Sequence, residues 1–316
     1  MIIDLPDTTT SKISKEIQSM REKGGVVTLG RVLTLVVLTK SGYEEEAIEA
    51  ANLASREHPC RIIVLADASG QDVTRLDAQI RVGGDAGASE VVVLHGYGEL
   101  ANQSESLVSA LLLPDAPIVA WWPHGIPESA SQTSIGKIAH RRITDSANEP
   151  DPREALRRIS NSYAEGDTDL AWTRLTNWRI QLAAAFDQLD DEPITSLLVE
   201  GASDSPSTLL LAAWLRGALN VPTTVIEDPA GTGIRRVVLQ REQGSIELLR
   251  PGTQEATLTQ PEQPVQHISL PRRSLQDCLS EELRRLDPDE VFGEVITENL
   301  GSLLAAEAAE EVVVAR

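Results

Sequence analysis

The 316-residue chain has few aromatic residues, few cysteines and a deficit of positive charge. Its two cysteines, Cys60 and Cys278, lie far apart in the sequence, which excludes a CxxC redox motif and a zinc knuckle. No apolar run approaches the ~20 residues that span a bilayer, and the N-terminus lacks the basic start and apolar run of a signal peptide. We therefore expect a cytoplasmic protein.

The charge balance restricts the partners that the protein can have. There are 48 acidic residues against 28 lysines and arginines, which gives a formal net charge of −20. Nucleic-acid-binding proteins concentrate basic residues that displace counterions from phosphates, and anionic membranes attract the same residues. We expect neither nucleic acid nor a membrane as a partner, and the negative charge favours solubility.

Apolar runs alternate with helical stretches along the first 125 residues, as is typical of a layered α/β domain. A glycine-rich turn at 83–88 separates two of these runs. The expected elements are, in order, a strand at 28–39, a helix at 43–58, strands at 61–66, 78–84 and 89–96, a helix at 99–113 and a strand at 116–122.

The same rhythm resumes after a polar stretch, so the sequence predicts an α/β fold of two layered domains. Strands at 195–201 and 221–227 flank a helix, and a strand pair at 234–250 follows with a tight turn at Gly244. This order echoes the first half and leaves two interpretations open, a duplicated unit or two unrelated α/β domains. The expected division is an N-terminal α/β domain 1–125, a long polar loop with connecting helices 126–192, a C-terminal α/β domain 193–300 and an Ala/Glu-rich tail 301–316.

The sequence contains no convincing active site. A GxGxxA pattern begins at Gly96, but Glu99 would place a carboxylate where a diphosphate binds at a helix N-terminus, so a plain glycine turn is favoured. The five histidines lack metal-binding spacing, and the nucleophile-elbow and P-loop patterns are absent. We expect no catalytic residue, no cofactor and no metal, and hence a protein that is not an enzyme.

Four of the five tryptophans fall in two short segments, 121–127 and 166–179. Neighbouring residues of a strand point to opposite faces, so Trp121 and Trp122 cannot both face one side. One ring is expected to point inward, and the other to lie under a helix or at an exposed surface. Pro123 ends the strand directly after them.

The second tryptophan segment predicts a helix over 169–189. Asp167 or Thr168 is the expected N-cap, because a side-chain oxygen there accepts a hydrogen bond from the first helical turn. At 100° per residue, Trp172 falls within an apolar stripe that is expected to face the core.

Three residues of this helix leave two interpretations open. Trp178 lies at the edge of the apolar stripe, four residues from Arg174, close enough for the guanidinium to stack on the indole. Arg179 lies within the apolar face, where its charge needs an acidic or phosphate partner or must reach solvent. The composition fits an interface hot spot and a well-packed domain seam equally well.

The segments WWPHGIP, AHRRITDSA and GDTDLAWTRLTNWR resemble the signature of the OpcA-type glucose-6-phosphate dehydrogenase assembly proteins. The resemblance covers about residues 31–286. It implies a protein without chemistry of its own that binds glucose-6-phosphate dehydrogenase and promotes its active oligomer or activity in the oxidative pentose phosphate pathway. Family members in photosynthetic bacteria are associated with redox control through cysteines, which we do not extend to a chain with only Cys60 and Cys278.

The same segments provide a predicted set of residues that contact the dehydrogenase. Arg141 and Arg142 follow the polar loop, where they would meet an acidic patch or a phosphate, or else lie on a solvated helix face. The predicted contact residues are Trp121, Trp122, His124, Arg141, Arg142, Trp172, Arg174, Trp178 and Arg179.

The alternative is a sugar-phosphate-binding protein or enzyme with an arginine-lined site between the two domains. In that protein the tryptophan rings would form the walls of an anion pocket. Its arginines would be Arg141, Arg142, Arg174 and Arg179.

Overall fold

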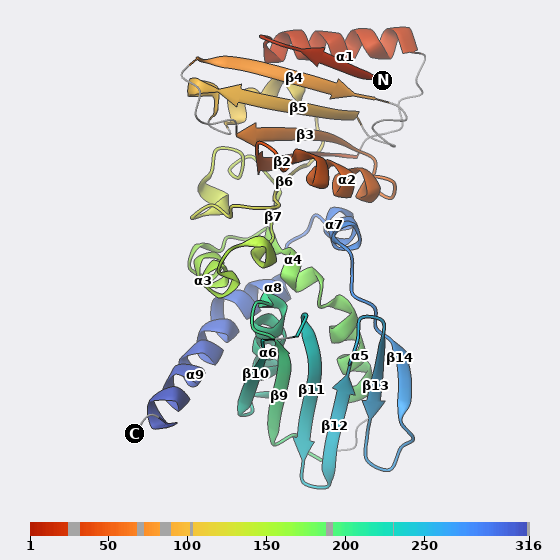
Figure 1. Cartoon of the computed structure of the whole chain (residues 1–316), viewed down its shortest axis with the longest axis vertical. Helices are drawn as coiled ribbons and strands as arrows, with labels where there is room; N and C mark the ends of the chain where they lie inside the picture. The colour runs from red at the N-terminus through yellow and green to blue at the C-terminus, as the bar shows by residue number, and fades with distance from the viewer. Residues whose placement is uncertain are drawn as a thin grey trace. The chain divides into compact units, whose positions relative to one another are not determined.

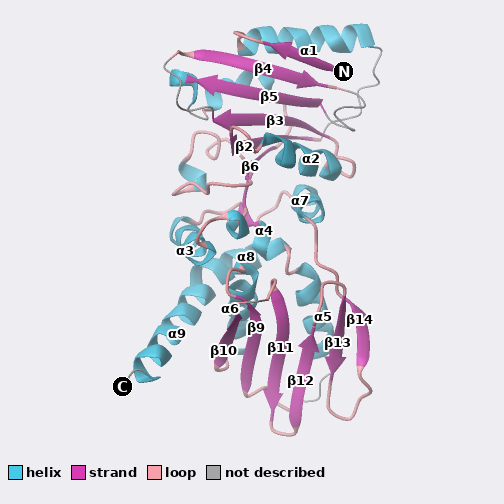
Figure 2. Ribbon diagram, in the orientation of Figure 1, coloured by secondary structure: helices cyan, strands magenta, loops and turns pink. Residues whose placement is uncertain are grey.

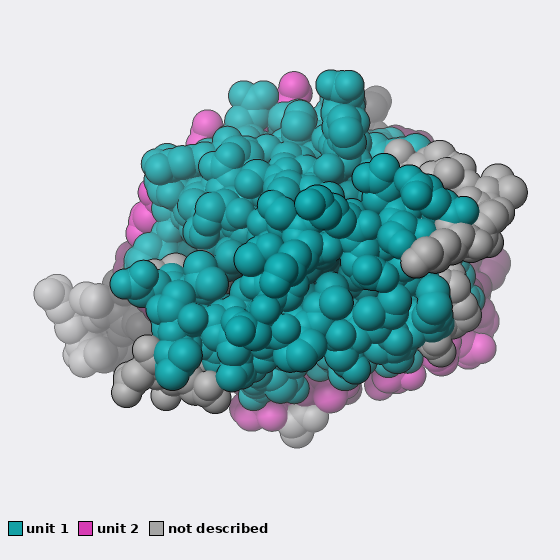
Figure 3. All heavy atoms as spheres, turned by 90° about the horizontal axis from the view of Figure 1, so that it is seen from above, with its two compact units in different colours: residues 1–145, 164–168, 274–288 teal, residues 146–163, 169–273, 289–316 magenta. Residues whose placement is uncertain are grey.

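The computed structural model describes residues 1–24, 32–67, 73–82, 90–101, 104–187, 192–229 and 231–314, which fall into two compact units shown in teal and magenta in Figure 3. Each unit combines helices with one mixed β-sheet, so the predicted α/β class is confirmed. Both units are discontinuous in sequence. Unit 1 consists of residues 1–145, 164–168 and 274–288, and unit 2 consists of residues 146–163, 169–273 and 289–316.

Unit 1 is built on the eight-stranded sheet of Figure 1. Neighbouring strands from β5 through β7 run parallel, whereas β4 is antiparallel to both β1 and β5. The order across the sheet is β1 (Ile2–Leu5), β4 (Arg75–Arg81), β5 (Glu90–Tyr97), β3 (Cys60–Asp67), β2 (Leu33–Lys40), β6 (Ile118–Trp122), β7 (Arg141–Thr144) and β8 (Asp167–Asp169).

The central strands of this sheet are the continuous apolar runs expected of parallel strands that are covered on both faces. β2 and β3 are buried along almost their whole length, and Ile13 and Ile17 of α1 join a core cluster with side chains of these strands. α2 packs against α7 within the same unit. The α-helices of unit 1 are α1 (Thr10–Gly24), α2 (Glu44–Ala54) and α7 (Leu275–Arg284).

The prediction of a helix over 99–113 was wrong. The described residues there form three short 3₁₀ segments, η2 (Gly98–Ala101), η3 (Glu105–Leu107) and η4 (Ser109–Leu111). One backbone donor of this stretch is used outside any helix, since the Glu105 N–H donates to Ser134 Oγ at 2.7 Å. The predicted turn at 83–88 and the start of the strand at 28–31 lie outside the described residues.

Unit 2 contains a six-stranded sheet, seen in magenta in the lower half of Figure 2. β9 and β10 are parallel, and an antiparallel run from β11 to β14 follows, with Gly244 at φ +133° in the predicted tight turn. Antiparallel β11 borders β9, whereas parallel β6 borders β2, so the two sheets do not repeat one strand order. The order is β10 (Thr223–Asp228), β9 (Ser196–Ala202), β11 (Ile234–Arg241), β12 (Gly244–Leu249), β13 (Glu255–Thr259) and β14 (Gln266–Ser269).

The helices of unit 2 gather around α6, which is apolar on most of its surface and packs on β9, β10 and α9. The tail segment is helical through Val314, as part of α9. The helices are α3 (Pro152–Ser162), α4 (Leu170–Thr173), α5 (Thr176–Phe186), α6 (Pro206–Leu219), α8 (Glu290–Glu294) and α9 (Leu300–Val314), with the π-helical turn η7 (Val295–Asn299) between the last two. Across the residues that the structure describes, every helix is too short or too polar to pass through a membrane.

A substitution at Gly98 tests whether the glycine of the GxGxxA pattern is required by the backbone conformation. Its φ is +59°, and an added Cβ would lie 2.9 Å from the backbone of Thr74. We expect Gly98→Ala to lower the free energy of unfolding by about 1–3 kcal/mol, because the alanine is strained and crowded. The measurement is the urea unfolding curve followed by circular dichroism.

Gly301→Ala is the matched control. Gly301 is exposed in α9, with no neighbour within 4 Å of an added Cβ. Alanine there raises stability by up to about 1 kcal/mol through helix propensity. Equal unfolding midpoints for the two variants would show that no steric constraint acts at Gly98.

Candidate functional site

The predicted contact residues divide into two groups, one in each unit. Trp121, Trp122, His124, Arg141 and Arg142 belong to unit 1, on and after β6 and on β7. Trp172, Arg174, Trp178 and Arg179 belong to unit 2, on α4, on α5 and between them.

The tryptophan pair ends β6, and both rings are buried, with exposed fractions of 0% for Trp121 and 4% for Trp122. Only Trp122 joins the core cluster that contains Leu38 and Leu65, as expected of neighbours that point to opposite faces. His124 follows them and is half-buried. Its ring lies 5.1 Å from that of exposed Tyr43, at an interplanar angle of 54°.

Arg141 and Arg142 lie on β7 and are buried, so the expectation of a solvated helix face was wrong. Arg141 Nη2 pairs with Glu282 Oε2 at 2.6 Å, and Arg141 Nη1 donates to the Asp287 carbonyl oxygen at 2.9 Å. Two charges in a strand are tolerated because each guanidinium is paired and hydrogen-bonded within unit 1.

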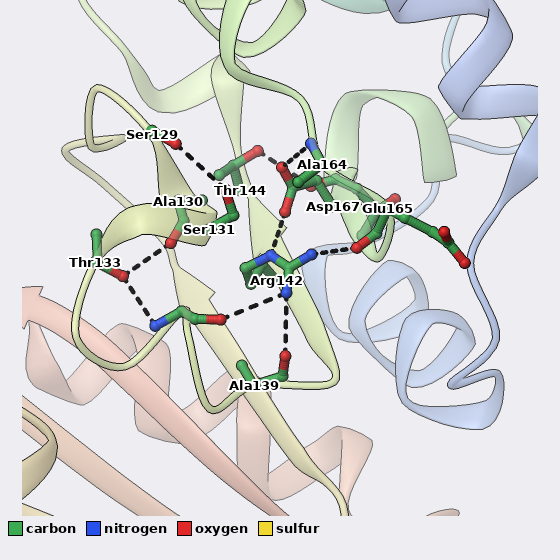
Figure 4. A network of polar contacts seen from close by, with 12 residues as sticks. Ser129, Ala130, Ser131, Thr133, Ala139, Arg142, Thr144, Ala164, Glu165 and Asp167 are labelled. Carbon is green, nitrogen blue, oxygen red and sulfur yellow. Dashed lines mark hydrogen bonds and ion pairs between the residues drawn. The ribbon is translucent and has the colours of Figure 1, made fainter.

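Arg142 is the centre of the polar network in Figure 4. It pairs with the Asp167 carboxylate and donates to the carbonyl oxygens of Glu165 and of Ala139, the latter at 3.0 Å. The Asp167 carboxylate also accepts from the Ala164 N–H at 2.8 Å. Burial raises the pKa of Asp167 above its usual range, although the hydrogen bond from Arg142 acts in the opposite direction.

The helix of the second tryptophan segment begins at Leu170, one residue later than predicted. The N-cap is Asp169, whose Oδ1 accepts from the Ala171 N–H at 2.9 Å, whereas Asp167 and Thr168 belong to β8. The expected helix over 169–189 is divided into α4 and α5. Asp169 has a second task, because it also accepts hydrogen bonds from the backbone N–H and hydroxyl of Ser146.

Trp172 is a core residue, as predicted, with an exposed fraction of 1%. Its Nε1 donates to Asp289 Oδ2 at 2.8 Å, and its ring lies 5.9 Å from that of Phe292. Arg179 stacks on the same indole at 3.9 Å and donates to Thr176 Oγ1. The aromatic face thus accommodates the arginine that the sequence placed in an apolar stripe.

Trp178 is buried, with an exposed fraction of 2%, and forms part of the wall of a pocket of about 380 Å³ in unit 2. The guanidinium of Arg250 lies 5.1 Å from the Trp178 ring, whereas the sequence suggested Arg174 as the stacking partner. Arg174 lines the same pocket.

The pocket combines residues from distant parts of unit 2. They come from the short turn at 146–148, from the start of α5 and the residues before it, from the N-terminus of α6, from a glycine-containing loop that leads into β11 and from segments after β12 and β14. Its arginines are Arg174, Arg250, Arg272 and Arg273. Of the arginine set predicted for an anion pocket, only Arg174 lines this one, and Arg141 and Arg142 are paired within unit 1.

Other chemical groups in the described residues are less concentrated. A search of the described ranges finds no group of three or more His, Cys, Asp or Glu side chains that would hold a metal ion. His95 lies two residues before the end of β5, and its Nδ1 lies 3.6 Å from Glu44 Oε1 in a second cavity of about 430 Å³. Cys60 and Cys278 are both buried.

Comparison with known protein families gives two matches. The model of the glucose-6-phosphate dehydrogenase subunit N-terminal domain matches residues 51–161, and the model of the C-terminal domain matches residues 165–296. A search of curated proteins found no match.

Two of the solved structures that resemble the chain are described as a ketoreductase and an oxidoreductase. The 3-ketoreductase KijD10 from Actinomadura kijaniata with NADP is 9% identical, with a TM-score of 0.47 over 85% of this chain and 94% of that one. An oxidoreductase from Sinorhizobium meliloti is 9% identical, with a TM-score of 0.48 over 88% of this chain and 97% of that one. TM-scores below 0.5 at such identity support no inference about activity.

Arg142 provides a direct test of whether its ion pair with Asp167 stabilises the fold. We expect Arg142→Gln to lower the free energy of unfolding by about 3–5 kcal/mol, because it leaves the buried Asp167 carboxylate without its cation. The loss should shrink as the pH falls through the raised pKa of Asp167, because the protonated carboxyl group has no charge to bury. Urea unfolding at a series of pH values measures both effects.

Arg157→Gln is the control for this change. Arg157 is exposed on α3 and pairs with Glu154 at 3.3 Å. Its loss should cost less than about 1 kcal/mol at any pH. If both variants unfold at the same urea concentration, the Arg142 network does not stabilise the fold.

Proposed function

Because the chain belongs to the family of glucose-6-phosphate dehydrogenase subunits, we propose that it is a non-catalytic accessory protein that binds this dehydrogenase and promotes its active oligomer or activity. One observation carries the proposal, namely that both domains of the family are present in one chain and in order. The proposed setting is the oxidative pentose phosphate pathway in the cytoplasm.

The contacts of the residues in the family-signature segments support a structural role for these residues. Arg141, Arg142, Asp169 and Trp172 make their polar contacts inside their own units. Such contacts fix the positions of chain segments. This favours a protein that acts by shape and association.

We propose that the half-buried members of the predicted contact set, His124, Arg174 and Arg179, touch the dehydrogenase directly. Each buried member would act by holding the surface of its own unit in shape; these members are Trp121, Trp122, Arg141, Arg142, Trp172 and Trp178. Activation then requires that this surface binds one conformation or oligomer of the dehydrogenase more tightly than another, because only differential affinity shifts an equilibrium.

The experiment combines purified chain with purified dehydrogenase from the same source. We expect the two to co-elute in size-exclusion chromatography, the dehydrogenase to move to a larger oligomer, and its activity to rise with the concentration of the chain. Dehydrogenase that neither binds this chain nor changes its kinetics or oligomeric state would overturn the proposal.

His124→Ala tests the proposed contact surface. We expect it to weaken binding to the dehydrogenase by about fivefold, which is about 1 kcal/mol, because it removes a half-exposed aromatic contact. The unfolding midpoint should stay unchanged, since the side chain is not in the core. Isothermal titration calorimetry and urea unfolding measure the two quantities.

His267→Ala is the matched control, because His267 is an exposed histidine on β14 in unit 2. It should leave both binding and stability unchanged. Equal dissociation constants for the two variants would exclude His124 from the contact surface.

A further inference from the structure

The arginine-lined pocket of unit 2 has a charge opposite to that of the whole protein. Four arginines and one acidic residue, Asp204, line the pocket, although the chain has a formal net charge of −20. Asp204 is exposed. Concentrated positive charge in a concave site raises the local concentration of anions.

Arg250 is the most buried cation of the pocket, with an exposed fraction of 6%. Its Nη2 donates to the Ile234 carbonyl oxygen at 3.0 Å, and its Nη1 donates weakly to that of Leu270 at 3.4 Å. Within the described ranges its buried Nε has no hydrogen-bond partner, and no carboxylate pairs with its guanidinium. A buried guanidinium held only by neutral groups is costly, because nothing compensates its lost hydration.

Arg272 brings a second guanidinium to the same place. A methyl group on Gly233 would lie 3.1 Å from Arg272 Nη2 and 4.0 Å from Arg250 Nη2, so both guanidinium groups approach this glycine. Burial, and then the charge of Arg272, lower the pKa of Arg250 to about 10, which still leaves it charged at neutral pH. No acidic side chain in the described part of the chain pairs with Arg272.

The N-terminus of α6 lies at the same pocket. Residues 204–207 line it, and the N-cap Ser205 makes no capping hydrogen bond with its side chain. Pro206 has no N–H and the Thr208 N–H donates to the Ser205 carbonyl oxygen, so the Ser207 N–H and the helix dipole are what favour an anion here. α6 follows β9, and a ligand in an open α/β sheet binds beyond the carboxyl ends of the strands.

We propose that this pocket binds the phosphate group of a small phosphorylated metabolite. Two guanidinium groups without carboxylate partners match the two charges of a phosphate monoester, and their planar forks suit its oxygens. The pocket volume of about 380 Å³ falls within the roughly 300–1,000 Å³ of small-molecule sites, which leaves room for a sugar-sized body beside the phosphate. Phosphate binding in this pocket does not require the dehydrogenase.

Calorimetry on the full chain alone tests the proposal. Inorganic phosphate, glucose 6-phosphate, glucose and succinate are titrated at pH 7.5 and at matched ionic strength. We expect saturable one-to-one binding of phosphate and glucose 6-phosphate, no binding of glucose and much weaker binding of succinate. Affinity for glucose 6-phosphate should fall below about pH 6, where the dianion of a phosphate monoester takes up one proton and becomes a monoanion.

Arg272→Gln supplies the decisive variant, because Arg272 is exposed and its loss leaves the core intact. We expect it to raise the dissociation constant for phosphate by about tenfold or more, through the loss of a charge-assisted contact. Arg284→Gln removes the same charge from an exposed site on α7 in unit 1 and should leave the dissociation constant unchanged.

Three results would overturn the proposal. They are the absence of saturable phosphate binding by the natural chain, an undiminished affinity in Arg272→Gln, and a succinate affinity equal to that of phosphate. Because the titrations contain no dehydrogenase, none of these results bears on the proposed accessory function. Likewise, a dehydrogenase that does not bind the chain would not contradict the proposed phosphate site.

Discussion

Unit 1 depends on two adjacent buried arginines, because it is assembled from three separate stretches of chain. Arg142 of β7 pairs with Asp167, which lies in the stretch 164–168, and Arg141 pairs with Glu282, which lies in the stretch 274–288. Successive strand residues point to opposite faces, so neighbouring positions serve two different returning segments. Buried ion pairs contribute little net stability after desolvation, but an arginine without its carboxylate would be costly. The pairs therefore specify which segments return to the sheet.

Unit 2 is held together in the same way by residues of the segment 166–179. It consists of the stretches 146–163, 169–273 and 289–316. Asp169 accepts hydrogen bonds from Ser146 in the first stretch, and Trp172 donates to Asp289 in the last. The segments that resemble the family signature thus include residues whose ion pairs and hydrogen bonds join the separate stretches of each unit. A resemblance carried by such residues reports on a shared architecture, and the surface that meets a partner is a separate question.

Apolar patterning was sufficient for most of the two sheets, because β2, β3, β5 and β9 are apolar runs bounded by turns. β7 escaped prediction because its sequence, Arg-Arg-Ile-Thr, reads as polar, and only partners far away in the chain make its burial possible. The pocket escaped for a similar reason. Arg250 and Arg272 lie in segments whose proximity to Trp178 follows from the fold of unit 2 and from no local spacing.

The buried arginines of the two units differ in whether a carboxylate pairs with them. The chain has 48 acidic residues, so carboxylates are plentiful, and the fold brings one to each of Arg141 and Arg142. Arg250 is as deeply buried as Arg142, yet its guanidinium donates to carbonyl oxygens and lies near an indole face, and among the described residues no carboxylate pairs with it. Charge repulsion from Arg272 adds to the cost of that arrangement. A buried cation beside a second cation is unfavourable until an anion enters between them, and the open pocket beside Trp178 gives such an anion access.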